Sequence, residues 1–272
     1  MRTAQQLRRL FARKGIDFAK PGFYDTPQFL AAEREDSRFL ETYAEFVSVQ
    51  RFDRAYVARA REVIPNVVAT VSMELSRAAR HGACVDVSGL IMRMLEAEGI
   101  WSYAIGGAVE ISFPGESNLP PSYFWPITLP DNPIFAGHMW VCAPPFKVVD
   151  VALPVQQWTL EKASYFPEYV LSDLARPAEP TVGDLLDADA VRDFVAHEDR
   201  LPTMEDVRRL TPWLFPFMRS FRAFAVVVGQ LRIKYVPTKV SATDRPLADM
   251  VIPELNGKRP RGIYADYKQQ HP

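Results

Sequence analysis

Cysteine and histidine are scarce in this sequence, with two cysteines, Cys84 and Cys142, and four histidines in 272 residues. Two cysteines are too few for a disulfide scaffold or a thiolate zinc site, and His81, His197 and His271 lack convergent partners in the sequence. We therefore expect no metal and no cofactor. A reducing, cytoplasmic setting fits this cysteine usage best.

An excess of either charge is also missing. The chain carries 32 lysines and arginines against 33 aspartates and glutamates, and its net charge is −1. Without a basic surplus to hold phosphates, a general nucleic-acid binder is disfavoured. Small-molecule or protein substrates are the expected partners, and the oligomeric state is left open.

Long hydrophobic runs are absent as well. The most apolar stretch, residues 213–229, is interrupted by Pro216, Arg219 and Arg222, which a membrane-spanning helix would seldom accept, so we expect no membrane insertion. The basic, acid-free residues 1–16 faintly resemble a transit peptide. Their apolar side fits an ordinary amphipathic helix, and we adopt that interpretation.

Helical signals dominate residues 1–80. Thr26 and Pro27 have the chemistry of an N-cap and a first helical residue, and a second helical stretch covers about residues 53–80. Within that stretch, Pro65 predicts a break or kink.

The centre of the chain is rich in strand-forming residues. Three segments, 102–113, 138–143 and 147–153, have β-type composition and are separated by proline and glycine. The segment 113–137 between the first two has several prolines and aromatics without periodicity. A loop of that length is usually functional or disordered, and our hypothesis is a wall or lid over a binding site.

Helical patterns return after residue 159, with predicted helix starts at Thr181 and Thr203. One or two late strands are expected around Gly229, and the polar tail from residue 241 is expected to wrap the surface. The fold class is therefore α+β. We divide the chain into a helical region 1–80, a catalytic core 81–158 and a helical region 159–272, packed as one compact unit.

The most informative position is Cys84, which follows two small residues and begins an apolar helical pattern ending at Gly99. At a helix N-terminus, unpaired backbone N–H groups and the positive end of the dipole stabilise a thiolate. The same N–H groups can face the oxyanion that forms when a carbonyl is attacked. The alternative is a small buried cysteine that only packs.

His138 and Asp150 are the natural partners for such a thiol. Polar side chains inside two otherwise apolar strands are costly to bury unless they satisfy one another. The register of the intervening hairpin decides whether they meet, and an odd-length loop around Pro144 would place them opposite each other on one face. We favour that loop over a two-residue Pro144-Pro145 turn, which would place them on opposite faces.

Together these residues supply a nucleophile, a base and a residue that orients the base. The alternative is a structural His–Asp pair that holds the hairpin. Cys142 lies mid-strand with no helix end to activate it, so we interpret it as packing.

These residues resemble the transglutaminase-like branch of papain-type cysteine enzymes. The matching pieces are Gly82-Ala83-Cys84, Gly99-Ile100, Gly106-Gly107, His138-Met139-Trp140-Val141 and Val148-Val149-Asp150, within residues 80–153. The resemblance implies a papain/transglutaminase-like core in which the catalytic helix packs on a small antiparallel sheet, with helical N- and C-terminal extensions. It also implies a Cys84–His138–Asp150 triad that acts through a thioester.

The acyl acceptor is left open by the sequence after Asp150. Val151-Ala152 is more similar to arylamine N-acetyltransferases, which share the triad, than to the Pro-Thr common in transglutaminase-like domains. Hydrolysis of a peptide or amide is our first expectation, with a peptide, protein, or small amide or thioester as substrate. The alternatives are acyl transfer to an amine and a non-catalytic binding or scaffold protein with a vestigial triad.

Further residues are candidates for holding the substrate or its oxyanion. Gln50 is a candidate for the second oxyanion donor that the family draws from an upstream glutamine or tryptophan. The remaining candidates for this role or for the pocket are Gly82, Trp140, Tyr123 and Trp125.

Overall fold

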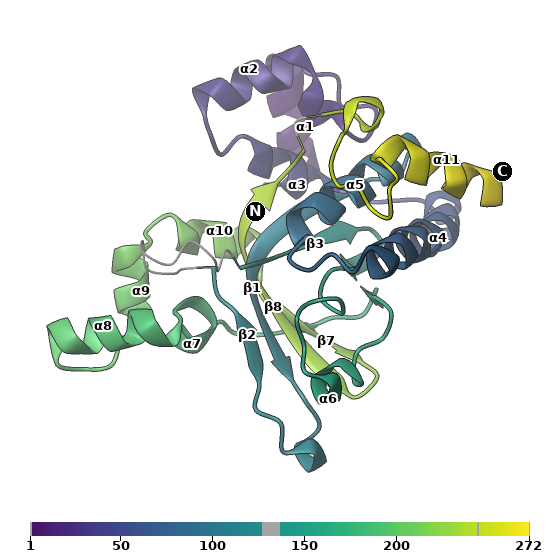
Figure 1. The fold of residues 1–272 in the computed structure, drawn as a ribbon. Coiled ribbons are helices and arrows are strands. Elements are labelled where there is room, and N and C mark those ends of the chain that lie inside the picture. Colours follow the sequence, from purple (N-terminus) through teal and green to yellow (C-terminus); the bar gives the residue numbers. More distant parts are fainter. Residues whose placement is uncertain (1, 127–136, 244, 272) are drawn as a thin grey trace.

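An antiparallel sheet lies at the centre of the computed structural model, which describes residues 2–126, 137–243 and 245–271 (Figure 1). The strand order is β5-β4-β3-β1-β8-β7-β6, and β2 pairs with β1 off this path. The strands are β1 (Tyr103–Ser112), β2 (Ser122–Phe124), β3 (His138–Ala143), β4 (Phe146–Asp150), β5 (Val170–Ser172), β6 (Arg176–Pro177), β7 (Phe224–Val228) and β8 (Leu231–Ser241). Together with the helices they make an α+β fold, as predicted.

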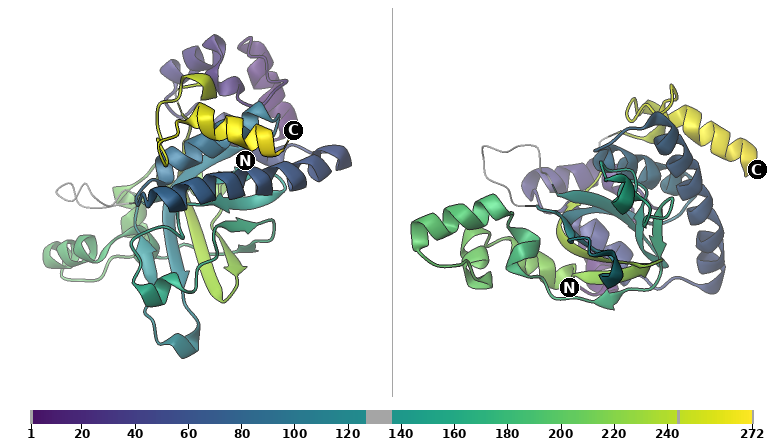
Figure 2. Two further views of the ribbon diagram at one scale, coloured as in Figure 1. Left: turned by 45° about the vertical axis from the view of Figure 1, so that its right-hand side comes forward. Right: turned by 60° about the horizontal axis from the view of Figure 1, so that its bottom comes forward.

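The sheet curls into a half-barrel, which is plain in the right-hand view of Figure 2. β1 and β8 are its longest strands, and their pairing is interrupted by a register shift between Gly106 and Gly107. Extra residues of this kind bend a strand and increase its twist. The predicted late strands around Gly229 are confirmed as β7 and β8, with Gly229 in the left-handed conformation between them.

The N-terminal region is helical, as predicted. Its elements are α1 (Ala4–Arg13), η1 (Phe23–Asp25), α2 (Pro27–Glu35), α3 (Leu40–Val49) and α4 (Arg54–Ala78). Thr26 caps α2 and Pro27 is its first residue. Leu7 and Phe11 are fully buried on one side of α1, which confirms the amphipathic interpretation of this segment.

Helix α4 runs from Arg54 to Ala78 and contains Pro65 in its interior, so of the predicted break or kink the break is absent. Burial of Ile64 and Val67 on either side of the proline stabilises the helix through tertiary packing, which outweighs the lost hydrogen bond. Helix α11 (Pro260–Gln270) packs against α4. It lies in the C-terminal tail, which we expected only to wrap the surface.

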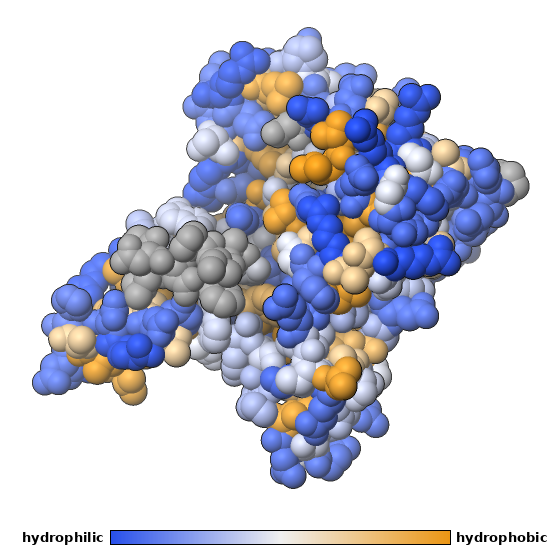
Figure 3. All heavy atoms as spheres, viewed as in Figure 1, coloured by the Kyte–Doolittle hydropathy of each residue, from blue (hydrophilic) through white to orange (hydrophobic). Residues whose placement is uncertain are grey.

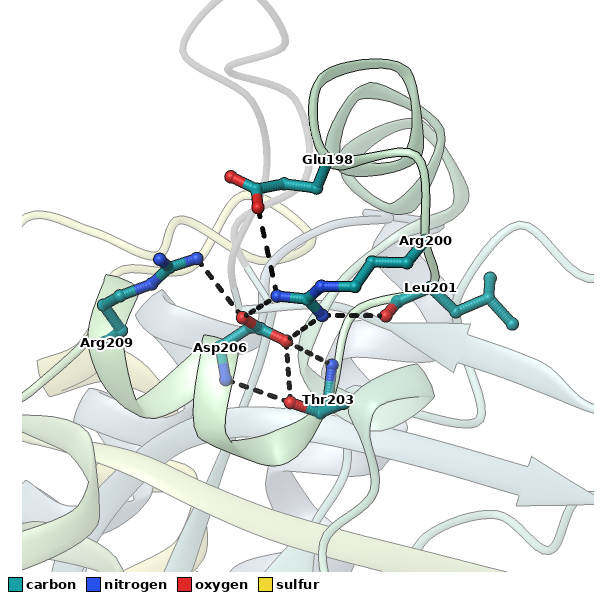
Figure 4. Close-up of polar contacts among 6 residues, drawn as sticks. All are labelled: Glu198, Arg200, Leu201, Thr203, Asp206 and Arg209. Carbon is teal, nitrogen blue, oxygen red and sulfur yellow. Dashed lines mark hydrogen bonds and ion pairs between the residues drawn. The ribbon is translucent and has the colours of Figure 1, made fainter.

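The segment between β5 and β7 contains short helices: α7 (Val182–Leu185), α8 (Ala188–Glu198), α9 (Met204–Leu210) and α10 (Leu214–Ser220). The predicted starts at Thr181 and Thr203 are confirmed, and each is a capping box. Helices α7 to α9 project from the sheet as an arm (Figure 1). At its turn, Arg200 binds both oxygens of Asp206 at 2.7 Å, and Asp206 also accepts from Thr203 (Figure 4).

One buried hydrophobic cluster includes residues from all three sequence regions, from Leu7 through Trp140 to Tyr267. Outside it, the face seen in Figure 3 is mostly hydrophilic, with small separate apolar areas. Within the described part of the chain, no helix combines the length and the apolar character needed to cross a membrane. The remaining short elements are η2 (Gly115–Ser117), α6 (Leu160–Ala163) and η3 (Leu247–Asp249).

The segment predicted to form a wall or lid is partly ordered into η2 and β2. Its residues 127–136 lie outside the described residues. The third predicted strand is shorter than expected, because β4 ends at Asp150 and residues 151–153 continue as a bend. Asp150 therefore lies at the point where the chain leaves the sheet.

Candidate active site

Cys84 is the first residue of α5 (Cys84–Ala97), as predicted. Gly82, two residues earlier, has a φ of +68°, a conformation that glycine adopts without strain and that brings the chain into the helix. The first amides of the helix have no intrahelical acceptor and therefore point their N–H groups toward the thiol's surroundings. The Cys84 side chain is buried, with 9% of the residue exposed.

Helix α5 is held against the strand that carries the histidine. It packs on β3, and the Ser88 hydroxyl, one turn beyond Cys84, donates a 3.3 Å hydrogen bond to the carbonyl of Met139. Asp86 in the first turn pairs with Arg80. These contacts set the start of α5 beside the start of β3, where His138 lies.

The β3–β4 hairpin differs from the predicted one. Its loop is the two-residue Pro144-Pro145 turn, joined by a cis peptide, so the predicted odd-length loop is wrong. Val141 pairs with Val149 but Ala143 pairs with Phe146, so β4 holds one extra residue between these pairs. If the register of the Val141–Val149 pair is continued by one residue away from the turn, Asp150 lies opposite Trp140.

The extra residue in β4 brings Asp150 onto the same face of the hairpin as His138. A two-residue turn without this bulge would place them on opposite faces. Because side chains alternate along a strand, a residue opposite Trp140 lies on the same face as His138, two positions away. The His138 Nε2 is 2.7 Å from the Asp150 Oδ2, and both side chains are buried. The predicted pairing of the two residues is therefore present, although by a different register.

Asp150 is held by four donors. Its Oδ1 accepts from the backbone N–H groups of Ala152 and Leu153, each at 3.0 Å. Its Oδ2 accepts from His138 and, at 3.3 Å, from the Tyr235 hydroxyl on β8. The carboxylate is thereby fixed in position, as a group that orients a histidine requires.

Tyr235 was not among the predicted site residues. It is fully buried, packs on Trp140 with ring centroids 4.8 Å apart, and its pKa is raised well above the usual value by burial and then by Asp150. A tyrosine within a late apolar strand is the only sequence signal for it. Trp140, predicted to touch substrate, instead supports the pair from within the core.

The two ring nitrogens of His138 have different roles. Nε2 donates to Asp150, so in the neutral ring Nδ1 carries the lone pair. Nδ1 is buried, and no described atom meets it with full hydrogen-bond geometry. The Cys84 thiol is nevertheless close enough that the two groups shift each other's pKa.

The pKa values favour a thiolate–imidazolium pair. Burial raises the pKa of Cys84, but the neighbouring His138 side chain outweighs burial, so the thiol pKa lies below its ordinary value. Burial lowers the pKa of His138, but the Asp150 carboxylate outweighs that effect and raises it to about 10. The proton is therefore held on the imidazole over the range in which the thiol ionises.

Cys84 and His138 line one small cavity of about 130 Å³. On the α5 side its wall includes Val85, which is 54% exposed, and on the opposite side it includes Trp213, the residue before α10, which is 48% exposed. The other described lining residues are Gly107, Pro126, Gly137, Met139, Leu214, Thr238 and Lys239. The thiol is therefore bordered by two exposed apolar side chains.

Two glycines permit the close backbone approach beside His138. Gly107 lies opposite His138 in the β1–β3 pair, and a Cβ there would lie 2.1 Å from the Val236 carbonyl oxygen. A Cβ at Gly137 would lie 2.5 Å from the Gly107 carbonyl oxygen. No other residue type fits at either position without moving the strands.

None of the five residues predicted to hold the substrate or its oxyanion lines this cavity, and Gly82 only precedes the helix start beside it. Gln50 lines a second, larger cavity. Tyr123 and Trp125 stack on each other at 5.4 Å, and the Trp125 indole donates to Gly183. Phe124, between them on β2, is the residue that contacts the His138 ring, at 5.3 Å, because alternate side chains point to opposite faces.

Cys142 has the inert environment that its mid-strand position predicted. Its thiol donates to the Lys147 carbonyl at 3.1 Å, and burial raises its pKa to about 11. Among the residues that the structure describes, no group of three or more potential ligands could hold a metal ion. The reactive features therefore gather at Cys84.

No family model, curated protein or solved structure matches this chain. The case for a function therefore depends on the site itself.

Proposed function

We propose that this protein is a cysteine-dependent hydrolase of peptides or amides with a Cys84–His138–Asp150 triad. The observation that carries the proposal is the buried 2.7 Å contact between His138 and Asp150 beside a thiol at a helix start. In this proposal, α5 with strands β1, β3 and β4 is the papain/transglutaminase-like core. A helix with an N-terminal cysteine that packs on an antiparallel sheet supports that comparison.

In the first step the Cys84 thiolate attacks the carbonyl carbon, and a C–S bond forms as the carbonyl oxygen becomes an oxyanion. The intermediate collapses when the C–N bond breaks, and the His138 imidazolium gives its proton to the leaving amine. In the second step His138 takes a proton from water, and the hydroxide attacks the thioester. The C–S bond then breaks, the acid leaves, and the Cys84 thiolate and the His138 imidazolium are restored.

The backbone N–H of Cys84 is the first oxyanion donor in this proposal, because it lies at the start of a helix. A second donor is the Trp213 indole, which lines the same cavity. It replaces Gln50, which lies elsewhere. Trp213→Phe tests this role, since it keeps an aromatic wall and removes the N–H; a lower kcat with unchanged KM is expected.

Acyl transfer to an amine is the second candidate. The Val151-Ala152 sequence after Asp150 favours it, as does the access to Cys84 past exposed apolar side chains, which suits an amine with an apolar body. The two candidates differ in product partitioning. Amine incorporation that competes with hydrolysis at a shared acyl-enzyme favours transfer.

Alkylation by iodoacetamide at about pH 6 tests the triad, and the chain provides its own control. We expect Cys84 to react faster than a free thiol of pKa near 8.5, and Cys142 to remain unmodified in the folded protein. If Cys84 reacts no faster than that free thiol, the triad is vestigial and a binding or scaffold role replaces the enzyme.

The substrate class is tested by profiling amide, peptide and thioester donors with wild type and Cys84→Ala. Acyl-enzyme should be trapped as a mass increase on Cys84 and be absent from the variant. A donor that turns over equally well with Cys84→Ala contradicts the mechanism.

A further inference from the structure

A second cavity, of about 500 Å³, is larger than the one at Cys84 and has the size and composition of a small-molecule site. It lies between α3, the Pro144-Pro145 turn and the β6–β7 edge of the sheet. Its apolar lining includes Tyr103, Ile105, Phe146, Phe221 and Phe224.

This cavity and the Cys84 cavity lie at opposite ends of one face of β3. His138, Trp140 and Cys142 alternate onto that face, with His138 at the first cavity and Cys142 at the second. Trp140 is fully buried between them, opposite Ile105. The second cavity is therefore separate from the triad.

The charged lining residues of the second cavity are all cations. Lys147, Arg176 and Arg222 line it and are exposed, and its described lining includes no aspartate or glutamate. Within the described chain none of the three forms an ion pair. An anionic group in this cavity would meet cationic side chains and no described carboxylate in the lining.

The interior offers one unused donor. The Nε2 of Gln50 is buried, lines this cavity through its residue, and has no hydrogen-bond partner in the described structure. A buried amide without a partner costs free energy, so such groups usually meet a ligand or water.

We propose that the second cavity binds an amphiphilic anion, whose apolar body packs between Tyr103, Phe221 and Phe224. Its anionic head lies at Arg176, Arg222 and Lys147. The cavity volume suits a chain or ring of drug-fragment size, and the aromatic lining matches an apolar body. The site is independent of the proposed chemistry at Cys84.

Isothermal titration with octanoate, octyl phosphate and octanol tests the proposal, because the three share an apolar chain and differ in the head. We expect at least one anion to bind with a Kd on the order of 1 mM or tighter, and octanol to bind at least about tenfold more weakly. Cys84→Ala should bind the anion as wild type does, because the triad is elsewhere.

Two double variants, one at the cavity and one away from it as a control, each remove two arginine charges. Arg176→Ala with Arg222→Ala should weaken anion binding by at least about tenfold. Arg232→Ala with Arg261→Ala, both exposed and outside the cavity, should leave it unchanged. Equal affinity for octanol and the anions, equal loss in both double variants, or no binding by wild type would overturn the proposal.

Discussion

At the scale of single residues, the candidate site depends on Asp150 more than on any other side chain. Two backbone amides, His138 and Tyr235 all donate to it, so its position is fixed from three separate elements. The charge of this buried carboxylate raises the His138 pKa to about 10. The thiolate at Cys84 in turn depends on that protonated histidine.

Asp150→Asn should move the pH profile of Cys84 alkylation to higher pH. Without the carboxylate the imidazolium is less stable, so the thiol pKa rises toward its ordinary value and less thiolate is present at pH 6. The rate at pH 6 should fall about tenfold for each pKa unit of that rise. The rate of iodoacetamide labelling from pH 5 to 10 measures the shift, and an unchanged profile contradicts the role assigned to Asp150.

Gly107→Ala should destabilise the protein by about 2–4 kcal/mol, because its Cβ would overlap the Val236 carbonyl and force β1 and β8 apart. Urea denaturation measures the free energy of unfolding. Gly115→Ala is the matched control, since a Cβ there meets nothing within 4 Å, and it should change stability by less than about 0.5 kcal/mol. Similar losses in both variants would show that the close approach is not decisive.

At the scale of elements, helix starts organise much of the molecule. The start of α5 places Cys84, and the capping box at Thr203 begins α9 in the projecting arm. Helix α8, also in the arm, buries none of its residues. Leu185 of α7 and Val207 of α9, by contrast, join a small buried cluster with Ala108 and Val236 of the sheet. Local hydrogen bonds therefore matter most at the outer part of the arm, around α8 and the turn that leads to α9.

Thr203→Ala should loosen the arm without loosening the sheet. It removes the hydroxyl that accepts from the Asp206 amide and donates to its carboxylate, at a cost of about 1 kcal/mol. Amide hydrogen exchange should show faster exchange in α9 and unchanged exchange in β1 and β8. Equal acceleration in α9 and β8 would indicate that the arm and the sheet unfold together.

At the scale of the whole molecule, the last helix closes the outer side of the helical layer. α11 packs on α4, with Ile263 and Tyr267 buried, and Lys258 just before it binds Glu74 at 2.9 Å. This contact joins residues almost 200 positions apart in the chain. Its loss would expose the apolar side of α4.

Ile263→Ala should therefore cost about 2–4 kcal/mol of stability, since Ile263 is fully buried. Ile252→Ala is the control: Ile252 is 58% exposed, and its removal should cost less than about 0.5 kcal/mol. Urea denaturation of both variants measures the difference. Equal costs would mean that α11 adds little to the native state.

The sequence by itself determined the local features of this protein. The capped helix starts at Thr26, Thr181 and Thr203, the strand composition around β1, β3 and β8, and the helix start at Cys84 were all predicted correctly. Each depends on residues within one or two turns of the chain, whose backbone preferences and side-chain hydrogen bonds act locally. The α+β class follows from their order.

Only the tertiary structure decided which side chains meet. The pairing of His138 with Asp150 depends on a bulge in β4 that composition does not reveal, and the fourth donor to Asp150 comes from Tyr235, 85 positions later. The position of Gln50 at the second cavity and the continuation of α4 through Pro65 also depend on long-range packing. Register and packing depend on contacts between distant segments, and a local pattern cannot specify them.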